Sequence, residues 1–152
     1  MKVTAQIMKL NTPSKASGRV YSKDIMEKAI KEFNEKSLKC GTLGEMNHPD
    51  LTNISHKIEN IRIDEDKVFG DIELLDTPNG ITASALLESG VKLALAPKMN
   101  LDIQEEKDEE GNTILDENGQ PKTYIASAEI ISVDIIRDEQ KAFEDNTIKV
   151  ES

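Results

Sequence analysis

The sequence has 152 residues, enough for one domain with a hydrophobic core of its own. Acidic residues outnumber basic residues by 29 to 19, which gives a formal net charge of −10. A chain of this charge lacks the clustered Lys and Arg that phosphate groups require, so we expect no nucleic acid and no anionic membrane surface among its partners. It has no apolar run of about 18 residues, so no membrane-spanning helix is expected.

In the first half of the chain, the spacing of apolar residues predicts three strands and one helix. Residues 3–10 alternate apolar and polar side chains, which predicts a strand. Apolar residues then recur at helical spacing after Ser22, a residue type that often caps a helix start, and predict a helix over 23–37. Two further strand-like runs, 54–63 and 67–75, flank an acidic turn and predict a β-hairpin.

The second half predicts a short helix and two long strands. The helix is expected over 82–89, after a Pro-Asn-Gly turn. A strand over 91–103 should break or bulge at Pro97, because proline cannot donate a hydrogen bond to a strand ladder. Residues 104–121 are acidic and predict a solvated hairpin or mobile loop, and residues 122–137 return to strand character.

These elements predict an α+β fold, built as an antiparallel sheet or small β-barrel with one long and one short helix. We expect the domain to cover residues 1–143 and residues 144–152 to form a polar tail. No internal repeat is evident. The single cysteine, Cys40, cannot form an internal disulfide, which fits a reducing cytoplasm.

Candidate chemistry centres on two histidines, His48 and His56. His48 lies in an expected loop before Pro49, where its imidazole could serve as a general base. Two histidines without paired cysteines or a His-Glu zinc spacing predict no metal site, and nothing indicates a cofactor. A histidine base needs a nucleophile, yet no serine lies in a Gly-x-Ser-x-Gly elbow. The residues alone therefore leave the reaction undefined.

Residues 44–49 read Gly-Glu-Met-Asn-His-Pro, and this segment resembles the Gly-Glu-Leu-Asn-His-Pro motif of the prohead core serine proteases of T-even-like phages. Further matches follow in order, with Ser-His-x-Ile at 55–58 and Leu-Asp-Thr-Pro-Asn-Gly at 75–80. The resemblance extends over about 19–100 and more weakly over 122–143. It implies a fold like that of herpesvirus assemblins and an endopeptidase that digests the scaffold and trims capsid proteins during phage head maturation.

The nucleophile that the resemblance implies is missing. The family reads roughly Gly-x-x-x-Gly-Val-Ser-Ser-Arg-Gly, and counting from Gly90 places Ala96 at the first serine, Pro97 at the second and Lys98 at the arginine. Alanine has no hydroxyl, so the chain as written cannot form an acyl-enzyme. Two explanations are open. An introduced serine-to-alanine change at position 96 fits the intact His48, whereas a natural pseudoprotease fits the changes at the next three positions.

The resemblance implies that His48 acts on a serine at position 96 and that a residue from a later strand orients the imidazole. Asp134 is the candidate, because it is the one acid in the apolar run of the last predicted strand. A carboxylate buried in such a run needs a partner, and His48 would serve. Glu45 and His56 are the other candidates for this role.

The family cleaves after Glu, which implies a basic pocket for that side chain. Lys98, Lys92 and Arg62 are the available cations, and Lys98 is also the expected oxyanion donor because Pro97 has no N–H. The resemblance implies scaffold and capsid proteins as substrates. It also implies that the protein acts inside the prohead, in the host cytoplasm, where it could form a homo-oligomer. The alternatives are a non-enzymatic capsid- or scaffold-associated protein and a tube-forming structural protein with a related barrel.

Overall fold

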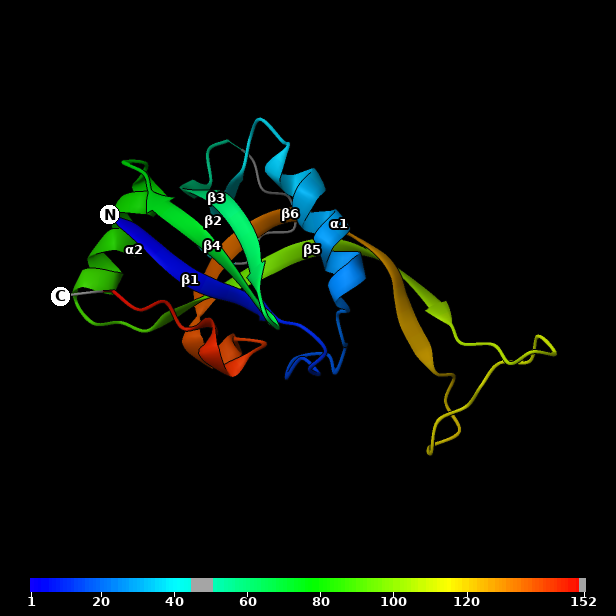
Figure 1. The fold of residues 1–152 in the computed structure, drawn as a ribbon. Coiled ribbons are helices and arrows are strands. Elements are labelled where there is room, and N and C mark those ends of the chain that lie inside the picture. The colour runs from blue at the N-terminus through cyan, green and yellow to red at the C-terminus, as the bar shows by residue number, and fades with distance from the viewer. Residues whose placement is uncertain (45–50, 151–152) are drawn as a thin grey trace.

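The computed structural model describes residues 1–44 and 51–150. Figure 1 shows a body of strands and helices from which a long two-stranded ribbon extends. In chain order the elements are β1 (Lys2–Lys9), α1 (Lys23–Asn34), β2 (Cys40–Thr42), β3 (Ile54–Asp64), β4 (Lys67–Leu74), α2 (Pro78–Glu88), β5 (Leu93–Glu105), β6 (Thr123–Arg137) and the 3-10 helices η1 (Asp138–Gln140) and η2 (Glu144–Asn146).

Two antiparallel sheets form the framework. Four strands pair in the order β1–β4–β3–β2, and β5 pairs with β6. In β4 the buried residues alternate with partly exposed ones, as expected for a strand with one face on the core. The α+β prediction is therefore confirmed. Over the ranges 1–44 and 51–150 the strands form two open sheets and no closed barrel, so the sheet is the correct one of the two expected architectures.

Helix α1 covers the core with one apolar stripe. The buried side chains recur three or four residues apart, and they are Met26, Ala29, Ile30 and Phe33. The helix ends at Asn34, three residues before the predicted end. The Asn34 side chain instead holds the backbone of β3, because its Nδ2 donates to Ile61 O at 2.9 Å and its Oδ1 accepts from Ile61 N at 3.3 Å.

Helix α2 begins at Pro78, four residues before the predicted start. Thr77 caps it, since its Oγ1 accepts a hydrogen bond from Gly80 N at 3.1 Å and donates one to Ile54 O at 2.6 Å. Pro78 suits the first helical position, where no N–H is needed. The segment predicted as a free turn is therefore the capped first turn of a helix.

The β5–β6 ribbon does not break at Pro97, so this prediction was wrong about the place of the irregularity. The register is regular from Leu93 to Lys98, with Pro97 opposite Val133, and it shifts between Lys98 and Met99 and again between Asp102 and Ile103. Within its sheet β5 pairs with β6 alone, and an edge strand tolerates proline where the missing N–H would point away from the partner strand.

The tip of the ribbon, residues 106–122, contains two turns (Figure 1). The two turns have the same pattern of hydrogen bonds. In each, an aspartate Oδ1 accepts from the amides two and four residues later at 2.9 Å; these aspartates are Asp108 and Asp116. Each aspartate N–H donates to the carbonyl four residues on, at 2.8 and 2.7 Å. Gly111 and Gly119 take the positive φ that each turn needs, 85° and 76°. The sequence carries this as a short repeat, Asp-Glu-x-Gly-Asn/Gln, at 108–112 and 116–120, which the expectation of no internal repeat missed.

The segment after β6, expected as a polar tail from residue 144, packs on the body over its described part. Asn146 is fully buried, and its Nδ2 donates to Ile7 O at 2.6 Å and to Leu95 O at 3.2 Å. Ile148 N donates to Leu93 O at 2.8 Å. These bonds tie the segment to β1 and to the start of β5. None of the described helices is both long and apolar enough to cross a membrane.

Candidate functional site

The register of the ribbon brings position 96 beside the buried acid. Ala96 is the partner of Asp134, and Lys98 is the partner of Ser132, so the four side chains share one face. Ser132 Oγ donates to Asp134 Oδ1 at 3.0 Å. Asp134 and Ser132 are buried, whereas Ala96 and Lys98 are partly exposed. The predicted nucleophile position and the predicted orienter are therefore neighbours across two strands.

The segment that leads into residues 45–50 reaches the same place. Thr42 N donates to Asp134 Oδ1 at 3.1 Å, and Gly44 N donates to Ile135 O at 2.6 Å. His48 and Glu45 lie outside the described residues, so their positions are not part of this geometry. Gly44, the first residue of the motif that contains His48, nevertheless lies against the strand that carries Asp134.

Asp134 is an unusual carboxyl group, because it is only 1% exposed and sits between two strands. Burial raises its pKa, since the charged form loses hydration. Hydrogen bonds from Thr42 and Ser132 and the positive charge of Lys98 oppose this shift. The protein therefore surrounds a desolvated carboxyl group with donors and a cation, an arrangement typical of functional sites.

His56 is fully buried, and both of its ring nitrogens have protein partners. Ser55 Oγ lies 2.7 Å from Nδ1, and Val133 O lies 2.6 Å from Nε2. A carbonyl only accepts, so Nε2 carries the proton and Nδ1 accepts from the Ser55 hydroxyl. Burial lowers the pKa of His56 to about 4, with the Val133 carbonyl opposing this effect. With both nitrogens engaged in this way, His56 does not suit the role of orienter for His48.

The stability of the fold should fall on acidification because of His56. Its pKa is about 4 when folded and about 6.5 when unfolded, so the unfolded chain binds the proton more readily. The contribution is present above pH 6.5 and is lost as the pH falls toward 4, by about 3 kcal/mol in all. We expect His56→Gln to show a correspondingly smaller drop in the free energy of unfolding between pH 7 and pH 4. Equal drops in parent and variant, measured by urea denaturation, would contradict this.

Gly41 leaves the space through which His56 reaches β6. The two residues are partners in the β2–β3 pairing. A Cβ at position 41 would lie 1.7 Å from Val133 O and 2.5 Å from His56 Nε2. Both neighbours are held in place, one as backbone and the other by two hydrogen bonds, so neither can yield cheaply.

Gly41→Ala should therefore destabilise the protein by about 3 kcal/mol, the upper range for overpacking a core. Gly18→Ala is a suitable comparison, because a Cβ there would meet no atom within 4 Å, although its positive φ of 73° adds a smaller backbone cost. Thermal and urea unfolding of the two variants measure the difference. A Gly41→Ala variant as stable as Gly18→Ala would show that β2 and β6 are less closely packed than described.

The structure separates the three candidate cations. Lys98 lies on the face of Asp134 and lowers its pKa through its charge. Arg62 is in β3 and pairs with Asp71, with Nη1 and Oδ1 3.2 Å apart. Lys92 precedes β5 and lies near Asp138, whose pKa is lowered mainly by a hydrogen bond from Thr147, with the charges of Lys141 and Lys92 acting in the same direction. Only Lys98, among these three, is close to position 96.

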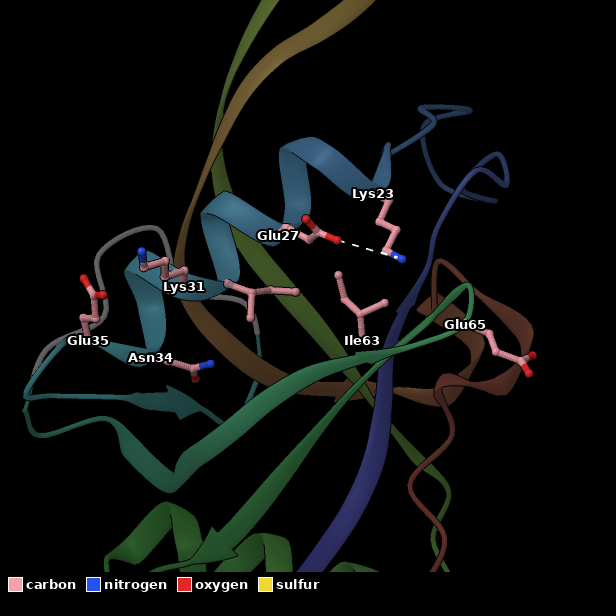
Figure 2. A pocket seen from close by; sticks show the side chains of 8 residues that line it. Lys23, Glu27, Lys31, Asn34, Glu35, Ile63 and Glu65 are labelled. Atoms are coloured by element: carbon pink, nitrogen blue, oxygen red, sulfur yellow. Dashed lines mark ion pairs between the residues drawn. The ribbon is translucent and has the colours of Figure 1, made fainter.

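A hollow lies between α1 and β3, and none of its lining residues belongs to the Asp134 cluster. It has a volume of about 590 Å³, and Figure 2 shows charged side chains of both signs around it. Lys23 and Glu27 form an ion pair across one turn of α1, with 3.9 Å between Nζ and Oε1. The mixed charge and the open shape give it no specific chemistry. In the part of the chain that the structure describes, no group of three His, Cys, Asp or Glu side chains could hold a metal ion.

Sequence reasoning did not identify Thr42 or Ser132 as parts of the site. Ser132 carried a usable signal, because it lies two residues before Asp134 in an apolar strand and so shares its face. Thr42 carried none, since it lies far from Asp134 in the sequence, and the strand pairing brings both its backbone N–H and its side chain to that carboxyl group.

Comparison with known proteins identifies the family. A family model described as prohead core protein serine protease matches residues 3–125. The chain belongs to the prohead core serine protease family. Its matched range includes Ala96 and ends before Asp134. Among curated proteins, no relative matches.

A solved structure, the capsid assembly protease gp21 of bacteriophage T4, is similar to this family member in fold. The TM-score is 0.72 at 17% sequence identity, and the similarity covers 90% of this chain and 81% of that one. At this identity the likeness establishes the fold and leaves the roles of individual residues to the geometry above. The family resemblance inferred from residues 44–49 and the segments that follow is thus confirmed.

Proposed function

We propose that this chain has the catalytic architecture of a serine endopeptidase of phage head maturation and that alanine at position 96 blocks its reaction. The observation that carries the proposal is the pairing of Ala96 with Asp134, beside the strand bond from Gly44 to Ile135. These contacts support the proposal, because position 96, a buried acid and the start of the histidine motif lie close together. Membership of the prohead core protease family supports the same reading.

With serine at position 96, the hydroxyl would attack the scissile carbonyl while His48 takes its proton and later gives it to the leaving amine. Asp134 would hold the imidazole in the correct tautomer and stabilise its charged form. Thr42 N and Ser132 Oγ both donate to Oδ1, and the Thr42 side chain also hydrogen-bonds to the carboxyl group, so His48 would take a remaining acceptor position of this carboxylate. The donors on Oδ1 would keep the carboxyl group from turning.

Lys98 would bind the substrate or its oxyanion and would not be a member of the catalytic triad. It lies two residues from position 96 on the same face, where its ammonium could meet an acidic side chain or the developing oxyanion. Pro97 offers no N–H for the oxyanion, so the next backbone donor along the chain also belongs to Lys98. The substrates would be scaffold and capsid proteins, cleaved inside the prohead in the host cytoplasm, by a chain that could act as a homo-oligomer.

A natural pseudoprotease is the second candidate function, and one observation favours it. Ala96, Pro97 and Lys98 lie in an unbroken strand register against β6, without the exposed turn that presents a nucleophile in many hydrolases. Such a protein would keep the fold and serve as a capsid- or scaffold-associated or tube-like component without cleaving peptides.

Two measurements separate these functions. A serine codon at position 96 in the source gene indicates the protease, and an alanine codon indicates the pseudoenzyme. The Ala96→Ser variant should then digest itself or scaffold peptides after Glu. If that variant is folded but inert, and His48→Ala changes nothing in any assay, the protease proposal fails. Rings or filaments in negative stain would support a tube-forming protein instead.

A further inference from the structure

Three hydrogen bonds, one from β3 and two from residues 42–44, reach three consecutive residues of β6. His56 Nε2 donates to Val133 O at 2.6 Å, Thr42 N donates to Asp134 Oδ1 at 3.1 Å, and Gly44 N donates to Ile135 O at 2.6 Å. Only the last of these is a bond between two backbones. The approach of residues 42–44 to the site therefore depends on side chains as much as on strand pairing.

The first of these bonds crosses β2. His56 belongs to β3, two strands away from β6, and its ring passes over Gly41 to reach Val133. The Val133 carbonyl only accepts and so fixes the tautomer with the proton on Nε2, while the Ser55 hydroxyl is the partner of Nδ1. Ser55 and His56 are both fully buried, so water does not compete for these bonds.

We propose that His56 is a positioning residue that sets the distance between the segment entering residues 45–50 and the strand that carries Asp134. Its hydrogen bonds go to Ser55 and Val133, so it would act through the Val133 carbonyl, which precedes Asp134 and lies opposite Pro97. The spacing itself is a property of the described fold. Its catalytic meaning rests on the proposed function, since residues 45–50 include His48.

Two variants of His56 test whether the length of its side chain matters, rather than only its polar character. In His56→Gln the side-chain amide nitrogen takes nearly the place of Nε2 and can still donate to Val133 O. In His56→Asn the amide lies near the place of Nδ1 and falls short of that carbonyl. Both residues are neutral and polar, so a role in positioning predicts that glutamine preserves the geometry and asparagine does not.

Amide hydrogen exchange tests the spacing directly. In His56→Asn, the amides of Thr42 and Gly44 should exchange at least about tenfold faster than in the parent, beyond any change at Leu10. The Leu10 amide is a suitable reference, because it bonds to Asp66 O at 2.6 Å at the β1–β4 end of the larger sheet. His56→Gln should keep the parent rates. A uniform acceleration at all three amides, or none in either variant, would overturn the inference.

A cysteine introduced at position 96 tests the catalytic meaning. In a protein that carries Cys40→Ser and Ala96→Cys, the rate of alkylation by iodoacetamide against pH reports the pKa of the introduced thiol, which a nearby imidazolium lowers from about 8.5. His56→Asn should move this pKa back by about one unit, and His56→Gln should not. A lowered thiol pKa that is the same in both variants overturns the positioning of the site. An unperturbed thiol pKa in the parent, with the exchange result intact, counts against the proposed function and leaves the spacing supported.

Discussion

An Ala96→Ser variant is expected to cleave peptides after Glu roughly 10⁴-fold faster or more than the parent chain, because the hydroxyl restores the attacking group of a triad. The change adds one oxygen to a partly exposed side chain on a regular strand, so it should not disturb the fold. Mass spectrometry of the variant and of added scaffold peptides identifies the cleaved bonds, and a time course gives the rate.

Two controls make this result specific. His48→Ala in the Ala96→Ser protein should return the rate to that of the parent, since the serine would lose its base. Ala126→Ser adds the same hydroxyl to a partly exposed position of the same ribbon, away from Asp134, and should have no activity. Activity in the Ala126→Ser protein would point to a contaminating protease, and a folded, inert Ala96→Ser protein would favour the pseudoprotease.

Much of the fold followed from periodicity. The amphipathic spacing of α1 and the alternation in β4 reflect burial on one face, and each predicted element corresponds to an element of the structure. The ends were less predictable, because they depend on particular contacts. Asn34 ends α1 by bonding to β3, and Thr77 starts α2 early by capping it while its hydroxyl also bonds to β3, a strand distant in the sequence.

The path of the last segment could not be predicted, because the decisive residue is polar. Asn146 is fully buried and serves two backbone carbonyls, one on β1 and one on β5. Asparagine is usually found on the surface of proteins, so the sequence predicts an exposed side chain here. Only the folded structure shows which buried carbonyl groups lack a hydrogen-bond donor. The same holds for His56, whose use depends on the absence of a side chain at Gly41.

The site was predictable as a set of residues and only partly as an arrangement. Resemblance gave His48 and position 96, and the apolar run around Asp134 marked that acid as buried, which the structure confirms. The register between β5 and β6 was beyond sequence reasoning. A slip of one residue would turn Asp134 to the opposite face from Ala96, and only the folded ribbon determines this pairing.

Asp134→Asn in the Ala96→Ser protein is expected to lower kcat by roughly 10³- to 10⁴-fold with little change in KM, as when the orienting acid of a triad is replaced. Asparagine is close to aspartate in shape, and its oxygen can still accept from Thr42 N and Ser132 Oγ. It cannot stabilise an imidazolium, and its NH₂ group would favour the wrong tautomer of His48. Single-turnover cleavage of a Glu-containing peptide measures the change in rate.

The stability of the same variant should move in the opposite direction from its activity. Burial raises the pKa of Asp134, so holding this carboxyl group charged at neutral pH destabilises the folded state, and the cost lessens as the pH falls through the raised value. The neutral asparagine removes that cost, so the free energy of unfolding at pH 7 should stay equal or rise. Asp102→Asn, an exposed acid on β5, should alter neither property. An Asp134→Asn protein that loses stability and keeps its rate would make this carboxylate a structural group, since a triad acid is retained for catalysis at a cost to the fold.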